Sequence, residues 1–292
     1  MSVRNGGEKI LGSIYSILNQ KDIDLEFILV NDGSTDDTFS ILSNVAIRDS
    51  RIRLLNRPPR GLTVSLIEAC SEAKGEFIAR QDALDYSMPE RLIMQAAKLQ
   101  NEPTASLCST TVKFITEERV TVLIQSPTKE EMEKGLSGII HGSTMFRRMH
   151  YQRVGGYRKE FYYAQDVDLW SRLVEVGKHI VLPEVLYENC VYPSSISGSH
   201  RSEQKKLHSL IVGATGARKS GGNEDIWLKK ASKFSEACRI ISNKKMNVSQ
   251  GAYFIGSCLM KQDPLLAQKY LQLAVQSNPL NLRARLKILG LI

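Results

Sequence analysis

The sequence predicts an α/β domain followed by an all-α C-terminal extension, and three observations support this. Residues 25–30, LEFILV, form a continuous apolar run of strand length, which is typical of a strand buried on both faces. Strand-like and helix-like segments alternate through about the first hundred residues, which indicates βαβ units and a mostly parallel sheet flanked by helices. After Ser194 the apolar periodicity is helical almost to the end of the chain.

The expected elements follow in a regular order. Residues 8–18 place five apolar side chains on one helical stripe, and the strand 25–30 runs into NDGSTDDT, a turn whose capping residues suit a helix start. Pro89 lies at a tolerated first-turn position and opens a later helix. Between these segments we expect a helix at 38–48, a strand at 51–55, a helix at 64–74 and a strand at 77–79.

The pattern changes after Pro103. Two segments, 106–115 and 119–124, read as paired strands joined by a polar turn. The later segments predict a helix at 126–136, a strand at 141–148, an amphipathic helix at 168–176 and an extended stretch at 181–192.

Composition narrows the protein class. Of the 292 residues 42% are hydrophobic and 24% charged, which is ordinary for a soluble globular protein. No apolar run reaches the roughly 18 residues that a membrane span needs, and the N-terminus lacks a signal-peptide core. The 5 cysteines are scattered without a CxxC pair, so we expect reduced thiols in a cytoplasmic protein and no structural zinc.

The positive charge is concentrated in the tail. Residues 201–292 carry 16 Lys or Arg against 5 Asp or Glu, whereas the whole chain has a net charge of only +8. This surplus is either a solvated helical face or a basic module that touches an anionic membrane surface or a polyanionic substrate. No nucleic-acid-binding motif accompanies it. Residues 250–292 look like one tetratricopeptide helix pair plus a further helix, or a generic helical hairpin, and must pack on something.

Several motifs occur together in a particular order: FILVNDGSTDDT, GEFIARQDALD, PERL, HGSTMFRR and AQDVDLWSRL. Their series closely resembles the family 2 glycosyltransferases, inverting enzymes of the GT-A fold that use nucleotide-diphosphate sugars. The resemblance covers roughly residues 2–200, so we expect a GT-A domain over 1–200 and a basic helical region over 201–292. It implies a Mg²⁺ or Mn²⁺ cofactor, a UDP-sugar as donor, and a glycan or lipid-linked acceptor.

The resemblance also implies roles for single residues. Asp32 ends a buried strand and would accept an N–H group from the donor base, although it could simply cap the NDGST turn. The donor would also contact Ser2, Arg60 and Asp82. For Arg60 the alternative is that a cation before a glycine is simply common in loops. Asp166 would be the catalytic base that takes the proton from the acceptor hydroxyl; its alternative role is a helix N-cap.

Three further residues are candidates around this site. His141 would contact the acceptor or the diphosphate, although a lone histidine is more often structural. The segment SISGSHRSEQ is similar to the loop that closes over the nucleotide in relatives, so His200 could reach the metal and Arg201 the diphosphate.

Two departures from the family pattern bear on activity. The family has Asp-Ala-Asp-Asp where this chain has Asp82-Ala83-Leu84-Asp85, so Leu84 replaces the acid expected to bind the metal. Asp85 could substitute as ligand, or His200 and the diphosphate could suffice. Otherwise the protein binds its donor weakly, works without metal, or is inactive. The first strand also looks truncated to the SV of Ser2 and Val3, which a misplaced start codon or a degenerating gene would explain.

We therefore expect an inverting glycosyltransferase in cell-surface polysaccharide synthesis, cytoplasmic and peripheral to the inner face of the membrane. The runner-up is a non-catalytic relative that binds nucleotide sugar or a protein partner. A dinucleotide-dependent oxidoreductase is disfavoured because no GxGxxG follows an expected strand, and the Asp166 region argues against a nucleotidyltransferase.

Overall fold

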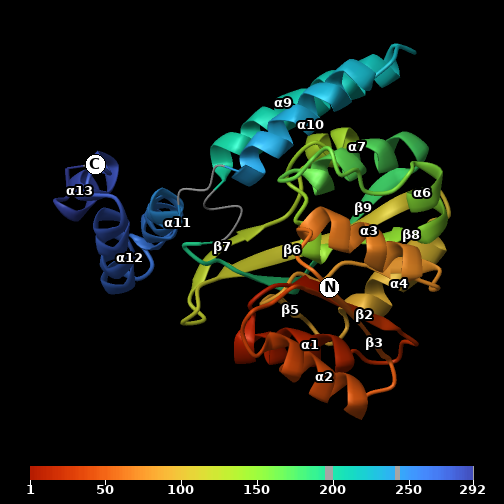
Figure 1. Ribbon diagram of the computed structural model, residues 1–292, viewed down its shortest axis with the longest axis horizontal. Coiled ribbons are helices and arrows are strands. Elements are labelled where there is room, and N and C mark those ends of the chain that lie inside the picture. Colours follow the sequence, from red (N-terminus) through yellow and green to blue (C-terminus); the bar gives the residue numbers. More distant parts are fainter. Residues whose placement is uncertain (195–199, 241–243, 292) are drawn as a thin grey trace.

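The structure, a computed structural model, describes residues 1–194, 200–240 and 244–291. Its N-terminal part is built on a sheet of three parallel strands in the order β1-β2-β3 (Figure 1). The strands are β1 (Ser2–Val3), β2 (Phe27–Asp32) and β3 (Ile52–Arg57). Leu29 and Val30, adjacent in β2, are both fully buried, so the prediction of a strand covered on both faces is confirmed.

Helices cover both faces of this sheet. One face packs against α1 (Ile10–Leu18) and α2 (Thr38–Arg48), with Leu29 and Leu42 in their shared core. The other face packs against α3 (Leu62–Glu72), where Val30 meets Ala69. The short β1 is an end strand of this sheet and pairs in parallel with β2, with Ser2 opposite Val30.

The second sheet has mixed pairing. Its order is β4-β8-β6-β9-β5, with β7 added on β6, and β6 with β9 is its parallel pair. The strands are β4 (Phe77–Ala79), β5 (Tyr86–Ser87), β6 (Ala105–Ile115), β7 (Thr121–Gln125), β8 (Met145–Arg147) and β9 (Lys178–Cys190). The expected parallel sheet therefore holds for the first three strands, whereas β4 pairs antiparallel with β8, which comes much later in the chain.

The helices of this part are short. They are α4 (Arg91–Asn101), α5 (Lys129–Lys134), α6 (Arg148–Arg153) and α7 (Gln165–Val176). The prediction of one strand over 141–148 was wrong: a 3₁₀ turn at His141–Ser143 comes first and the strand is only β8. The hydroxyl groups of Ser143 and Thr144 donate hydrogen bonds to backbone carbonyls of this turn. Such local bonds between side chain and backbone compete with the hydrogen bonds of a β-sheet.

Five helices complete the chain. They are α9 (Arg201–Lys219), α10 (Asp225–Ile240), α11 (Lys244–Leu259), α12 (Pro264–Ser277) and α13 (Leu282–Ile288). The first two form a hairpin against α7, and their core includes Phe161, Leu207 and Ala231. In Figure 1 the last three stand apart from that hairpin, beside β7.

The last three helices pack on the β6–β7 hairpin. Val122 and Val191 share a hydrophobic core with Ile255 and Leu271 of the helices. At the hairpin turn Glu118 accepts hydrogen bonds from Lys269 Nζ at 2.8 Å and Tyr270 Oη at 3.0 Å. The helical tail is thus attached to the α/β domain by both apolar and polar contacts. Within the described residues, no helix is at once long and apolar enough to cross a bilayer.

Candidate donor and acceptor site

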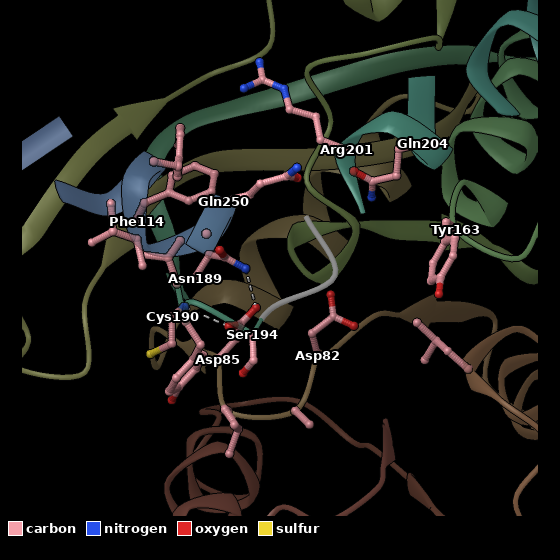
Figure 2. A pocket seen from close by; sticks show the side chains of 18 of the residues that line it. Asp82, Asp85, Phe114, Tyr163, Asn189, Cys190, Ser194, Arg201, Gln204 and Gln250 are labelled. Carbon is pink, nitrogen blue, oxygen red and sulfur yellow. Dashed lines mark hydrogen bonds between the residues drawn. The ribbon is translucent and has the colours of Figure 1, made fainter. Parts of the chain in front are cut away.

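A large cleft of about 2210 Å³ opens where the two sheets meet the helical tail. Six acidic residues line it, four of which come from three parts of the fold: Asp32 at the end of β2, Asp82 and Asp85 after β4, and Asp166 in the first turn of α7. The other two are Glu8 and Asp36. Figure 2 shows Asp82 and Asp85 at the centre of this region. Acids that are far apart in the sequence therefore meet at one edge of the fold, which is where α/β proteins bind ligands.

Asp32 fixes the loop that follows β3. Its Oδ1 accepts the backbone N–H of Arg60 at 2.8 Å and its Oδ2 that of Gly61 at 2.9 Å. Gly61 has φ +88°, a conformation that favours glycine, and a Cβ there would meet Tyr162 at 3.0 Å. The structural role of Asp32 is thus to shape a cleft-lining loop, and each of its oxygens keeps a lone pair for a ligand.

Asp82 belongs to a buried polar network. It forms an ion pair with Arg80, which is only 3% exposed. Burial would raise the pKa of Asp82, but the nearby Arg80 guanidinium holds that pKa below its usual value. Arg80 Nε also donates to His141 Nε2 at 3.0 Å, and Tyr157 Oη lies 2.7 Å from the same nitrogen.

This network sets the state of His141. An arginine can only donate, so His141 Nε2 must accept and the imidazole proton lies on Nδ1. Burial and the Arg80 charge lower the pKa of His141 to about 3. His141 is therefore a neutral cleft-lining residue that positions Arg80, and through it Asp82.

Leu84 sits in a backbone conformation unusual for its type. Its φ is +72°, the left-handed region that asparagine and aspartate tolerate better than leucine. Its side chain is partly buried against the N-terminal core, beside Ala83. The position thus has the backbone shape of a polar turn residue but carries a hydrocarbon.

Asp85 is fully engaged within the fold. It is 2% exposed, and it accepts hydrogen bonds from Tyr187 Oη at 2.9 Å, Asn189 Nδ2 at 2.8 Å and Cys190 N at 2.8 Å. The last two bonds are drawn in Figure 2. Burial raises the pKa of Asp85 well above its usual value, with the charge of Asp82 adding to the effect. Asp85 ties the loop after β4 to the end of β9.

These residues do not fit the metal site that the family pattern implies. Mg²⁺ and Mn²⁺ need free carboxylate oxygens, and here Leu84 has none while those of Asp85 are used by three protein donors. His200 stacks on Tyr163 with ring centroids 4.3 Å apart and does not line the cleft. The described part of the chain contains no group of three or more potential metal ligands. The predictions of Asp85 and His200 as metal ligands are therefore not carried forward.

Asp166 lies inside the helix rather than before it. The N-cap of α7 is Ala164, so the alternative role considered for Asp166, a helix N-cap, is corrected to a first-turn position. Burial raises the pKa of Asp166 to about 6, although two backbone N–H groups oppose the rise. A carboxylate with a pKa near neutrality can both take and return a proton at physiological pH.

A buried ion cluster holds the start of α7 in place. Asp168 is fully buried and pairs with both Arg158 and Arg172. The neighbour of Asp166, Gln165, is 6% exposed and lines the cleft, and its Oε1 has no hydrogen-bond partner within the described residues. The start of α7 therefore places a carboxylate at the cleft, with a buried and unpaired amide oxygen beside it.

The cleft brings together most of the residues expected from the sequence. Arg60 and His200 are the two that do not line it, and the expected nucleotide-closing loop lies partly at 195–199, outside the described residues. The cleft-lining residues that were predicted are Ser2, Asp32, Asp82, Asp85, His141, Asp166 and Arg201. Sequence reasoning missed Arg80, whose position two residues before Asp82 was a usable signal, and Tyr187, for which there was none.

The chain is similar to known glycosyltransferases. The family model described as glycosyl transferase family 2 matches residues 1–155. A putative glycosyltransferase, EpsE, of Bacillus subtilis (strain 168) is 35% identical over 196 residues, covering 64% of this chain and 70% of that protein. The chondroitin synthase of Pasteurella multocida (strain Pm70) is 27% identical over 199 residues, which are 68% of this chain but only 21% of that protein. The chain thus spans about a fifth of that synthase.

Solved structures share the GT-A fold. S. aureus TarS 1–349 in complex with UDP-GlcNAc has a TM-score of 0.61 at 16% identity, covering 99% of this chain and 87% of that one. The mannosyltransferase PcManGT of Pyrobaculum calidifontis, in complex with GDP-Man and Mn²⁺, has a TM-score of 0.57 at 18% identity, covering 99% and 85%.

Proposed function

Because the chain belongs to glycosyl transferase family 2, we propose that it moves a sugar from a nucleotide-diphosphate donor to a hydroxyl of a glycan, with inversion at the anomeric carbon. Polysaccharide synthesis is the setting that the named relatives support. Similar folds bind UDP-GlcNAc and GDP-Man, which supports a nucleotide-diphosphate sugar as donor, with a UDP-sugar as our first choice.

The observation that carries this proposal is Asp166. It lines the same cleft as Asp32 and Asp82, and its burial keeps the pKa close to the working pH. Inversion needs a single displacement, in which the acceptor oxygen attacks the anomeric carbon as its proton passes to one carboxylate. In this proposal Asp166 Oδ takes that proton, and no second carboxylate acts as nucleophile.

The donor occupies the other end of the cleft in this proposal. Asp32 has lone pairs that can accept an N–H group of the base. Ser2 and Asp82 would contact the sugar part of the donor, including its ribose. The leaving diphosphate carries the negative charge that must be stabilised. Arg4 and Arg201 line the cleft without an ion-pair partner among the described residues, so they are the side chains we assign to it.

The test is release of nucleoside diphosphate from a panel of UDP-sugars and GDP-mannose, with glycan acceptors, in EDTA and in Mn²⁺. Asp166→Asn should lower the rate by about 10²–10⁴-fold, the usual contribution of a general base. Asp225→Asn is the matched control, because Asp225 is also a first-turn helical aspartate but lies outside the cleft. An unchanged rate in Asp166→Asn would refute its role. Donor binding with no release from any donor would instead support a binding protein.

A further inference from the structure

The cleft is larger than a nucleotide sugar requires. Small-ligand sites usually measure about 300–1000 Å³, whereas this cleft is about 2210 Å³. Its additional wall comes from α9, α11, α13 and the turn before α13, which the family model does not cover. The cleft therefore has room for a second, extended ligand beside a nucleotide sugar.

Charge is distributed unevenly along this cleft. The lining residues before Cys190 include the carboxylates already described. Those from Ser194 onward include four cations and, among the described residues, no acid. The four are Lys205, Arg283 and Lys287, together with Arg201, which would serve the donor diphosphate as well. None of the four forms an ion pair within the described part of the chain, unlike Lys269, which is neutralised by Glu118.

The spacing of these cations is unfavourable without a ligand. Arg201 and Lys205 are four residues apart on α9, and Arg283 and Lys287 are four apart on α13, so each pair shares one helix face. Like charges at this spacing destabilise a helix by a few tenths of a kcal/mol. An anion between them would relieve that repulsion on both helices.

The same wall carries groups suited to sugars. Gln204 and Gln250 line the cleft, and Figure 2 shows them with Arg201 above Asp82 and Asp85. Ser257 Oγ is buried without a hydrogen-bond partner among the described residues. Phe254 also lines the cleft and stays 37% exposed, which is high for a large apolar ring. Polar acceptors and donors beside an aromatic face match an oligosaccharide better than a protein or lipid tail.

From these observations we infer that the helical tail forms one side of the acceptor site and that the acceptor is an anionic glycan, a sugar chain with carboxylate or phosphate groups. The inference rests on the proposed function and names its acceptor class. A membrane surface is the weaker occupant, because these cations line a concave cleft that also holds Asp166. The attachment of α12 to Glu118 and of α11 to Val122 holds this wall against the domain.

The test is direct binding of a labelled polymer, followed by fluorescence anisotropy. The probes are fluorescein-labelled carboxymethyl dextran and neutral dextran of equal length, each with the full chain at two salt concentrations. The test variant is the double substitution Arg283→Gln and Lys287→Gln. The matched control is Lys229→Gln and Lys233→Gln, which removes the same charge at the same spacing on α10, outside the cleft.

The wild type should prefer the anionic polymer. The α13 double variant should weaken that binding on the order of tenfold, since two close charge contacts are lost, while the α10 control changes it less than about twofold. Equal losses in both variants, or no preference for the anionic polymer, would overturn the inference. Phosphatidylglycerol vesicles are a further probe: if the α13 double variant weakens binding to these vesicles but not to the anionic polymer, the inference is also overturned. Binding needs no sugar transfer, so failure of nucleotide release in the separate assay remains distinguishable.

Discussion

Asp166→Asn should make the folded protein more stable at neutral pH while it removes activity. The reason is that burial raises the pKa of this carboxyl from its ordinary 3.8 to about 6. The folded state therefore holds the proton more tightly than the unfolded state. The favourable contribution is complete below pH 3.8 and is lost as the pH rises through 6, so at pH 7 the ionised carboxylate opposes folding.

The size of this effect follows from the shift. About two pKa units correspond to about 3 kcal/mol of unfolding free energy at pH 7.5. The Asp166 side chain remains partly open to the cleft and gains from the α7 N-terminus, so we expect a net gain of about 1–2 kcal/mol from the neutral asparagine. At pH 5 the gain should fall to about half, because part of the wild-type population is already protonated.

The assay is urea unfolding followed by far-UV circular dichroism at pH 7.5 and pH 5. Asp225→Asn is the control and should change stability by less than about 0.5 kcal/mol, because its exposed carboxylate complements a helix start and accepts one exposed hydrogen bond from Asn223. A variant no more stable than the wild type at pH 7.5 would show that burial of Asp166 is not a cost. A gain of equal size at both pH values would also refute the reasoning.

Three other predictions concern the cleft and its supports. Leu84→Asp should be tolerated at the φ of +72° and should add a carboxylate beside Asp82. In this variant, Mn²⁺ should therefore increase the rise in melting temperature that UDP produces. An identical effect of Mn²⁺ in the wild type would contradict this prediction. Asp168→Ala should lower the unfolding free energy by about 3–5 kcal/mol, because it leaves the buried Arg172 without an ion-pair partner and Arg158 with Glu224 alone; a urea titration giving less than about 1 kcal/mol would argue otherwise. Glu118→Ala should lower the local opening free energy of α12 by about 1 kcal/mol, so its amide hydrogens should exchange faster while those of α1 do not change. An equal change in both helices would show that the effect is global and not caused by the contacts of Glu118.

Local sequence signals predicted the elements that depend on near neighbours. The run at 25–30 became β2, and the segment 77–79 became β4 with the expected bounds. Asn278 and Pro279 separate α12 from α13, two of the helices expected within 250–292. In each case the deciding contacts, an apolar face or a proline, lie within a few residues of the element.

The pairing of strands could not be predicted in the same way. β4 lies next to β8, about seventy residues later in the chain, and no local pattern records that choice. The strand expected over 141–148 failed because its hydroxyl residues bond their own backbone, a preference visible only once His141 is held by Arg80.

The site shows the same division. Motif resemblance named Asp32, Asp82 and Asp166, all of which line one cleft. It could not foresee that Asp85 is saturated by donors from β9, since Tyr187 and Asn189 follow it by about a hundred residues.

In the motif Asp82-Ala83-Leu84-Asp85 the two aspartates have different roles, one at the cleft and one within the fold. Asp82 faces the cleft with its charge matched by Arg80, while Asp85 turns inward and joins two distant strands. Leucine at the intervening position removes a possible ligand but none of the bonds that hold the loop. Evolution can therefore change or abolish the chemistry of this loop without unfolding the protein, and a stable, well-folded product says nothing by itself about whether the site still binds metal.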